Sequence, residues 1–588
     1  MKTFLKMLLA TLLGGVLLIF LFFVFALSFA SLADKEVVIK DNSILSLDLT
    51  SQFVDRAIEN PFSSIDPFTG MPETPQGLNE VLASIKSAKN DDRILGIYLK
   101  GGIPLAGHAT LKEIRDALID FKTSGKFIYG YSEILTQKAM VLTSVADTFF
   151  VNPEGVVEWS GLSSSVMYYQ DALNKLGVKP VVLRATGNKF KSAVEPFLRQ
   201  DMSEANREQL TQLLGSIWQE HLNNVSKSTG KSVDELNSQA DTLFIADPEN
   251  AAEIGLIKAT AYYDQVLDVL MRKTSTEKEK DIPFISIRKY ASEAKLGDED
   301  GYSKNKIAVI YAQGDIVDGA GGDYSIGSTT VSKAIRQART NDKVKAIVLR
   351  VNSPGGSALA SEVIWREIDL ARKVKPVIAS MGDLAASGGY YISCYADTII
   401  AQPNTITGSI GAFGLFFTAE ELLNDKLGVN IETVKTNKHS DLGTIDRSLT
   451  ASEQRMLVHQ VDVIYGTFKE RVAEGRGMTV AEVDSIGQGR VWSGRDALQL
   501  GLVDMLGGLD TAIAIAANKA GVADDYRVVE YPEIEDPFTR IIKELSGDFE
   551  TKMVKSRLGN YARYFDIYEN AKKMEGFQTR LEYDLIID

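Results

Sequence analysis

The chain contains two copies of one pattern. When the 588-residue sequence is aligned with itself at an offset of 250 residues, segments with similar side chains meet in the same order along the chain. The matched segments are 97–100 with 347–350, 146–148 with 396–398, Pro153 with Pro403, and Gly161 with Gly411. We therefore expect two repeats of one fold, an N-terminal copy at 33–275 and a C-terminal copy at 303–530, joined by a linker at 276–302.

Each copy has the pattern of an α/β fold. In the C-terminal copy, short apolar runs rich in β-branched residues alternate with segments of helical spacing. The expected strands are 306–311, 344–351, 377–380 and 398–401, and the expected helices are 332–339 and 362–372. Strands that alternate with helices form βαβ crossovers, so we expect mainly parallel sheets. Residues 531–588 lie beyond the repeat, and their spacing predicts a helical tail.

The first residues predict a transmembrane helix. Lys2 and Lys6 precede an apolar run at 7–32. A helix of about 25 residues spans the ~30 Å hydrocarbon core of a bilayer, whereas the apolar part of a cleaved signal peptide is shorter, at about 7–15 residues. The small residues at 31–33 leave such a cleaved peptide as the alternative. Because basic residues stay in the cytoplasm, we expect residues 1–6 there and the rest of the chain exported.

Charge and residue usage exclude several classes of function. The net charge is −14, which argues against a protein that binds nucleic acid through a basic surface. The one cysteine, Cys394, excludes an internal disulfide and a cysteine-based zinc site. Four histidines leave little material for a metal centre. We therefore expect no metal, no other cofactor and no nucleic-acid partner.

The C-terminal copy has two glycine-flanked turns that the N-terminal copy lacks. Residues 352–357 (NSPGGS) follow a predicted strand, and the adjacent glycines allow backbone amides to point into a cleft. Residues 407–411 (TGSIG) place Ser409 between glycines, before a segment that we expect to be helical. Such a serine is either a helix N-cap or a nucleophile. The N-terminal copy has Trp159 at this position, which can be neither.

The N-terminal copy carries a lysine that the C-terminal copy lacks. Residues 188–197 (NKFKSAVEPF) align with the stretch that begins NKHSDL at 437–442, so Lys191 is aligned with Ser440. A lysine acts as a general base only when it is neutral, which requires a pKa below the ~10.4 of a free lysine. An apolar site where the two copies meet would lower the pKa in this way. The alternative interpretation of Lys191 is an ordinary surface cation.

Four motifs together resemble the signal peptide peptidase A family in its long, tandem form. They are 352–356 (NSPGG), 383–391 (DLAASGGYY), 407–411 (TGSIG) and 191–197 (KSAVEPF). The resemblance covers nearly the whole chain, including the predicted anchor and the duplication. It implies a tandem Clp protease/crotonase-like fold and a membrane-anchored Ser-Lys serine protease that degrades remnant signal peptides and other released or unfolded peptides.

The resemblance also implies roles for individual residues. Ser409 matches the nucleophile of the family, Lys191 its general base, and Gly356 the glycine whose amide helps to form the oxyanion hole. From the usual geometry of such holes we add the amide of Ile410, and we add Thr436 as a hydroxyl that orients the lysine. The family further implies a homo-oligomer, a tetrameric ring, held at the bacterial inner membrane with its catalytic body in the periplasm.

Three alternatives stay open from the sequence. A Ser-His-Asp peptidase of the same fold would use His439 and Asp441, although these lie where the N-terminal copy has its lysine. An acyl-CoA enzyme with a similar glycine turn is disfavoured by the export signal. A catalytically silent scaffold would bind peptides or partner proteins at the membrane without cleaving them.

Overall fold

The computed structural model describes residues 13–15, 17, 39–58, 75–243, 245, 247–294, 303–533 and 576–581. The predicted cytoplasmic residues 1–6 and most of the predicted anchor at 7–32 lie outside this part of the chain. Among the described residues, no helix is both long and apolar enough to cross a bilayer.

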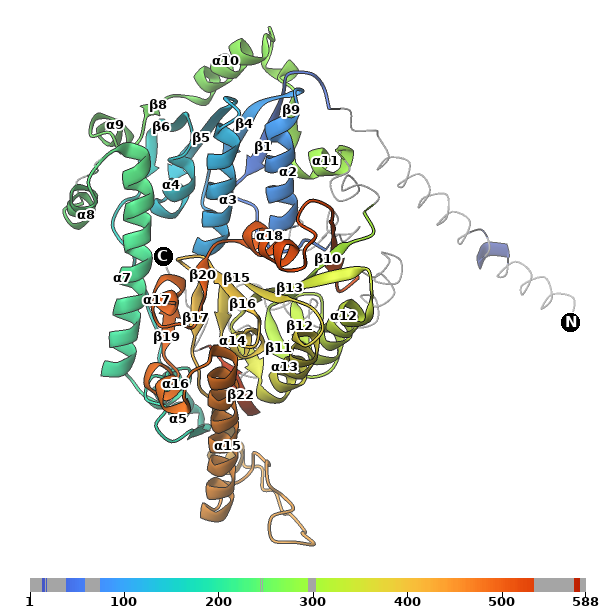
Figure 1. Cartoon of the computed structure of the whole chain (residues 1–588). Helices are drawn as coiled ribbons and strands as arrows, with labels where there is room; N and C mark the ends of the chain where they lie inside the picture. The colour runs from blue at the N-terminus through green and yellow to red at the C-terminus, as the bar shows by residue number, and fades with distance from the viewer. Residues whose placement is uncertain are drawn as a thin grey trace, which may run out of the picture.

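The N-terminal copy is built on a six-stranded sheet in which every neighbouring pair is parallel. In spatial order the strands are β8 (Ala259–Thr260), β6 (Thr148–Val157), β5 (Phe127–Leu135), β4 (Ile94–Lys100), β1 (Ser43–Asp48) and β9 (Phe284–Ser286). The helices of this copy are α2 (Leu78–Asn90), α3 (His108–Lys122), α4 (Gln137–Thr143), α5 (Gln170–Leu176), α6 (Glu195–Leu198), α7 (Glu204–Thr229), α8 (Val233–Asp241), α9 (Pro248–Glu253), α10 (Tyr263–Thr274) and α11 (Ile287–Glu293). Figure 1 shows this sheet above the C-terminal copy, with α7 running down the side of both.

The C-terminal copy is built on an eight-stranded sheet that is parallel except where β17 meets β19. Its strands are β10 (Lys306–Gln313), β13 (Val344–Ser353), β15 (Val377–Ala386), β16 (Thr398–Ala401), β17 (Ile406–Gly408), β19 (Val491–Ser493), β20 (Met505–Leu506) and β21 (Arg527–Tyr531). Its helices are α12 (Ser328–Thr340), α13 (Ala358–Arg372), α14 (Gly388–Ser393), α15 (Ala451–Arg476), α16 (Val480–Ile486), α17 (Gly494–Gln499) and α18 (Leu509–Lys519). Strands such as β13 are almost continuously buried, because helices cover both faces of the sheet.

The same order of elements recurs in the two copies, as the offset of 250 residues predicts. The N-terminal order β8-β6-β5-β4-β1-β9 is matched by β20-β16-β15-β13-β10-β21 in the C-terminal copy. Helices α2 and α3 span 78–90 and 108–122, and α12 and α13 span 328–340 and 358–372, so both pairs keep the offset. The prediction of an α/β fold with mainly parallel sheets is confirmed.

A third sheet joins the two copies. In spatial order it contains β12 (Ser325–Gly327), β11 (Asp315–Val317), β14 (Gly355–Ser357), β22 (Gly576–Arg580), β18 (Phe413–Thr418) and β7 (Lys179–Arg184). Strand β7 belongs to the N-terminal copy and pairs antiparallel with β18 along six residues. The chain that follows β7 is therefore held against the C-terminal copy.

A buried ionic cluster also links the copies. Arg350, in β13, is fully buried and donates to the carboxylates of Asp55 and Glu113 at 2.6 and 2.7 Å. Burial lowers the pKa of Arg350, but the two carboxylates outweigh it and raise the pKa above its ordinary value. The N-terminal residue at the offset of 250 is Lys100, whose side chain is largely exposed in its ion pair with Asp48. The buried cation therefore belongs to the contact between copies.

Two segments differ from the sequence-based expectation. The linker predicted at 276–302 is partly absorbed into the N-terminal copy, because Phe284–Ser286 pairs with β1 and α11 packs beside it. The tail predicted to be helical at 531–588 has its described residues 576–580 in strand β22. Strand β22 is extended because it finds pairing partners on both sides, β14 and β18, which lie far away in the sequence.

Candidate active site

Ser409 lies in the turn between β17 and β18. Its φ of 50° is in the left-handed region, and its N–H donates to the Arg490 carbonyl at 2.7 Å. We expected a helix after this serine, but Phe413–Thr418 is a strand, because the short apolar run pairs with β7 and β22. A non-glycine residue in the left-handed region is uncommon and is held here by the surrounding sheet.

Lys191 lies in the loop between β7 and α6, and the C-terminal copy holds that loop. The Phe190 N–H donates to the Gln488 carbonyl at 2.8 Å, and Asn188 Nδ2 donates to the Ala412 carbonyl at 2.8 Å. Gly489, with a φ of 82°, packs so closely that a Cβ atom there would lie 2.6 Å from Lys191 Cβ. A glycine is therefore required beside the lysine.

The two side chains meet in the interior of the protein. Lys191 Nζ lies 2.7 Å from Ser409 Oγ and 3.2 Å from the Ser409 carbonyl oxygen. Both residues have no exposed surface. Burial favours the neutral form of a lysine, because the charged ammonium loses its hydration. A neutral amine at this distance can accept the hydroxyl proton of the serine.

A second hydroxyl contacts the lysine. Lys191 Nζ donates to Ser387 Oγ at 3.0 Å, and Ser387 is also fully buried. Ser387 precedes α14, has a φ of 54°, and donates its N–H to the Gly408 carbonyl at 2.8 Å. This bond ties the Ser387 turn to the turn of the nucleophile candidate. Ser387 lies inside the 383–391 motif, but no role is predicted for it from the sequence; the serine before Gly388 and Gly389 was the available signal.

Comparisons with known proteins cover both copies. The family model of "Peptidase family S49" matches residues 120–277 and 369–523. Over 516 residues, the chain is 35% identical to "Serine protease SPPA, chloroplastic" of Arabidopsis thaliana, covering 87% of this chain and 74% of the relative. It is 38% identical to "Protease 4" of Salmonella typhi, over 75% of this chain and 72% of that protein.

A third relative extends the similarity further. "Protease 4" of Haemophilus influenzae is 34% identical over 88% of this chain and 85% of its own length. The chain belongs to peptidase family S49. It is a serine peptidase, and the family is matched twice, so the duplication seen in the sequence is a duplication of the S49 domain.

The two S49 matches divide the site between them. Lys191 lies in the first matched range, and Ser409 and Ser387 lie in the second. A solved structure of a ClpP1 mutant from Listeria monocytogenes aligns with 37% of this S49 chain and 98% of its own at 15% identity, with a TM-score of 0.25. That score is too low to assign a fold.

Two residues are predicted to form the oxyanion hole. Ile410 lies beside Ser409, and Gly356 lies in the Gly-Gly turn. Ile410 follows Ser409, is fully buried, and accepts the Gly489 N–H with its carbonyl at 2.9 Å. Gly356 lies in β14 with a φ of 154°, and a Cβ atom there would lie 2.1 Å from the Ile316 carbonyl oxygen. The backbone of this S49 chain therefore requires glycine at 356 for packing. The oxyanion role of both residues stays a prediction.

Thr436 is not brought to the lysine. It lies on an exposed stretch of the loop after β18, whereas Lys191 is fully buried. The expectation that Thr436 orients the lysine came from a loosely aligned stretch, and the hydroxyl that contacts Lys191 Nζ belongs to Ser387 instead.

The structure does not bring His439 and Asp441 to Ser409 as a Ser-His-Asp triad either. His439 Nδ1 lies 3.0 Å from a carboxylate oxygen of Glu453, and Asp441 accepts from Arg447 and Lys435 at 2.6 to 2.8 Å. His439 is therefore paired with the first turn of α15 and Asp441 with its own loop, while the side chain 2.7 Å from Ser409 Oγ is a lysine.

The equivalent place in the N-terminal copy is filled. Trp159, aligned with Ser409, is buried, donates its Nε1–H to the Leu236 carbonyl at 2.9 Å, and packs on Trp218. Nearby in the same copy, His108 and His221 are joined ring nitrogen to ring nitrogen at 2.9 Å. Burial lowers the pKa of both imidazoles, that of His221 to about 3, so both are neutral.

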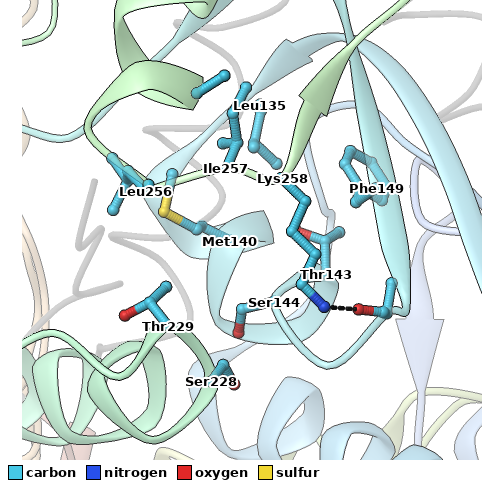
Figure 2. A pocket seen from close by; sticks show the side chains of 13 residues that line it. Leu135, Met140, Thr143, Ser144, Phe149, Ser228, Thr229, Leu256, Ile257 and Lys258 are labelled. Carbon is cyan, nitrogen blue, oxygen red and sulfur yellow. Dashed lines mark hydrogen bonds between the residues drawn. The ribbon is translucent and has the colours of Figure 1, made fainter.

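A cavity of about 330 Å³ is separate from the dyad. It lies in the N-terminal copy between β5, α4 and the segment around Ile257, as Figure 2 shows. Its wall includes Leu135, Met140 and Phe149, and Lys258 crosses it to donate to the Ala146 carbonyl at 2.7 Å. None of the residues that line it belongs to the Lys191–Ser409 site.

Proposed function

We propose that Ser409 is the nucleophile and Lys191 the general base of this serine peptidase. The observation that carries the proposal is the buried contact of 2.7 Å between Lys191 Nζ and Ser409 Oγ, formed by residues of different copies. We further propose that each copy has a Clp protease/crotonase-like fold, and that residues 33–275 and 303–530 are the two units whose meeting creates the site.

The reaction follows the acyl-enzyme template. The neutral amine of Lys191 takes the hydroxyl proton of Ser409 as the oxygen attacks the scissile carbonyl carbon. Backbone amides of Gly356 and Ile410 stabilise the oxyanion, and each such donor typically contributes about 3–4 kcal/mol to the transition state. The protonated lysine then donates its proton to the leaving amine. Lys191 next activates a water molecule, which hydrolyses the ester on Ser409.

Ser387 holds the base in place. Its hydroxyl accepts from Lys191 Nζ at 3.0 Å, so the amine is oriented by one hydroxyl while it faces the other. This arrangement leaves the lone pair of the neutral amine directed toward the Ser409 proton.

The substrates that we propose are cleaved signal peptides and other released or unfolded peptides. Residues 7–32 would hold the enzyme at a bacterial inner membrane as a single-pass protein, with residues 1–6 in the cytoplasm and the catalytic body in the periplasm. Signal peptides are released into that membrane, so an anchored peptidase meets them where they accumulate.

We also propose a tetrameric ring. The loop that follows β18 carries exposed apolar side chains, among them Leu427, Ile431 and Val434, which is 98% exposed. Exposed apolar side chains gathered in one region are typical of a surface that another protein covers. In Figure 1 this loop projects from the body together with the far end of α15.

A serine-directed fluorophosphonate probe tests the dyad. We expect labelling of Ser409 in the full-length enzyme, loss of labelling in Ser409→Ala, and slow labelling in Lys191→Ala. Mass spectrometry of the labelled peptide identifies the residue. Labelling of another serine, with peptide hydrolysis intact in Ser409→Ala, would refute the proposal.

Truncation tests the anchor and the assembly. Residues 34–588 should remain soluble, oligomeric and active on soluble peptides, because a single helix contributes little to the folded body. Light scattering gives the oligomeric state. Monomers or aggregates after truncation would contradict this part of the proposal.

A further inference from the structure

Gln209 lies in α7, beside the loop that carries Lys191. Its side chain is buried, with 1% of its surface exposed. The Nε2 atom donates to the Ser192 hydroxyl at 2.8 Å and to the Phe190 carbonyl at 3.2 Å. These two residues stand immediately after and immediately before Lys191 in the chain. One buried amide therefore holds the lysine loop on both sides of the lysine.

The other end of the same amide reaches the C-terminal copy. Gln209 Oε1 accepts the Val491 N–H at 3.3 Å. Val491 begins β19 and lies opposite Gly408, the residue before Ser409. One position earlier, the Arg490 carbonyl accepts the Ser409 N–H at 2.7 Å. Gln209 thus connects the lysine loop to the strand end that supports the nucleophile candidate.

The partners of Gln209 match the two ends of an amide. The Phe190 carbonyl can only accept a hydrogen bond, and the Val491 N–H can only donate one. A carboxylate at position 209 would lack the donor, and a methionine would lack both groups. Because the site is buried, removal of either group leaves a backbone partner without the hydrogen bond that this side chain supplies. The amide is therefore the chemistry that this junction between copies uses.

An ion pair on the outer side of α7 reinforces the same junction. The Arg490 guanidinium donates to Glu208 at 2.7 Å and to Gln212 at 2.6 Å. It also lies over the Phe190 ring, with 4.5 Å between the guanidinium carbon and the ring centroid. Arg490 thus ties its own segment both to α7 and to the residue before the lysine. Glu208 and Gln212 flank position 209 on the helix surface, so this contact helps to keep α7 in register.

The equivalent helix of the C-terminal copy has no amide at this position. Helices α7 and α15 both contain 26 residues, and both begin after a hydroxyl N-cap. Gln209 is the sixth residue of α7, and the sixth residue of α15 is Met456, whose side chain is 39% exposed. The fold of the repeat is therefore compatible with an apolar, solvent-facing residue here. The buried amide belongs to the copy that supplies Lys191.

We propose that Gln209 is a positioning residue that sets the approach of Lys191 to Ser409. The 2.7 Å contact between Lys191 Nζ and Ser409 Oγ joins two loops from different copies, and Gln209 holds one loop against the support of the other. A displacement of about 1 Å at a reacting group can cost about 100-fold in rate. The inference rests on the function proposed for Ser409 and Lys191, and it adds the residue that aligns them.

Gln209→Met tests the role, because methionine is of similar size and lacks both hydrogen-bonding groups. We expect kcat to fall about tenfold to 100-fold with KM unchanged, since substrate still binds while the base is displaced. Labelling of Ser409 by a fluorophosphonate should slow by a similar factor. Asn224→Leu is the matched control: Asn224 is another buried amide of α7, whose Nδ2 donates to Glu220 at 3.2 Å. It should leave kcat, KM and the labelling rate of the folded enzyme unchanged.

Ser192→Ala is a milder variant that serves if Gln209→Met does not fold. It removes one acceptor of the Gln209 amide and keeps the bond to Val491. The loss of one hydrogen bond predicts a decrease in kcat of about twofold to tenfold at constant KM. Wild-type kcat in Ser192→Ala, or wild-type kcat and labelling in folded Gln209→Met, would overturn the proposal.

A double variant shows whether Gln209 acts through the lysine. The labelling rates of Lys191→Ala and of the Lys191→Ala, Gln209→Met double variant should be equal, because no amine is left to position. A further tenfold loss in the double variant would overturn the proposal, since Gln209 would then act independently of Lys191. An active Lys191→Ala enzyme would refute the dyad itself. An inactive Lys191→Ala enzyme beside a fully active Gln209→Met enzyme would refute the role of Gln209 alone.

Discussion

The two copies share the same order of strands but differ in the residue that follows one pair of equivalent strands. In the C-terminal copy, the position after β17 carries Ser409 in a glycine-flanked turn, with Lys191 Nζ 2.7 Å from its hydroxyl. In the N-terminal copy, the equivalent position carries Trp159, whose ring fills the space and packs on Trp218. One copy thus keeps the turn of the proposed active site, and the other has a buried tryptophan in its place.

The difference is not a simple loss of function in one copy. The N-terminal copy gives up the serine and the Gly-Gly turn but supplies the lysine, through the loop that follows β7. The C-terminal copy has Ser440 where that lysine would be, on an exposed loop. Each copy therefore contributes one half of the proposed dyad, and a single copy would hold no complete site.

The largest expected effect comes from the C-terminal serine. Ser409→Ala should lower kcat about 10⁴- to 10⁶-fold, because the residual rate then comes from substrate binding and the oxyanion hole alone. Trp159→Ser, which restores a serine to the N-terminal copy, should create no activity in that background, since the position that aligns with Lys191 in the matching loop is Ser440. Turnover of a chromogenic peptide by each purified variant measures both effects. Wild-type turnover by Ser409→Ala would break the comparison.

Removal of the aligned cations of the two copies should lower the free energy of unfolding by different amounts. Arg350→Ala leaves the carboxylates of Asp55 and Glu113 buried without a cation, which typically costs about 3–5 kcal/mol. Lys100→Ala, at the equivalent N-terminal position, removes an exposed ion pair that typically contributes about 0–1 kcal/mol. Urea unfolding of the two variants measures the difference. Equal losses would show that Arg350 does not join the copies.

A smaller effect is expected at the residue that orients the lysine. Ser387→Ala removes one hydrogen bond to Lys191 Nζ, a contribution of about 0.5–1.5 kcal/mol, so kcat should fall roughly threefold to tenfold while KM stays constant. Gln137→Ala, at the equivalent place in the N-terminal copy, should leave kcat unchanged. A shift of the pH–rate profile in Ser387→Ala would show that the hydroxyl acts through the lysine; an unshifted profile with full activity would remove Ser387 from the site.

The smallest effect is expected in the loop of the C-terminal copy that matches the lysine loop. His439→Ala should change kcat by less than about twofold, because His439 pairs with Glu453 at the surface. Steady-state kinetics at neutral pH measures this. A large loss of kcat in folded His439→Ala would revive the Ser-His-Asp alternative.

The fold was predictable to a large extent from the sequence. Internal repetition and short apolar runs predicted strands such as 344–351 and 398–401, because buried parallel strands have a strong and local signal. The apolar run at 413–418 was wrongly expected to be helical, since short apolar runs fit either structure until their partners are known. The partners of β18 are β7 and β22, which lie far from it in the chain.

The site was predictable only in part. Ser409 and Lys191 were proposed from motifs and the resemblance, but their contact depends on β7 crossing to the C-terminal copy, which no local pattern shows. Ser387 was missed because a serine before two glycines is also an ordinary turn residue. Thr436 was chosen from a loosely aligned stretch. The position of 576–581 required the pairing of three distant segments.

The pH–rate profile of the Lys191 variants tests the central claim most directly. A lysine base works in its neutral form, so kcat/KM of the wild-type enzyme should rise with pH as Lys191 loses its proton and then level off. Lys191→Ala should remove most of the activity and the rise, and Lys191→Arg should restore neither, because arginine stays protonated. Lys189→Ala is the matched control, since Lys189 is exposed two positions away. An active Lys191→Ala enzyme with the wild-type pH profile would contradict the account of a dyad shared between the two copies.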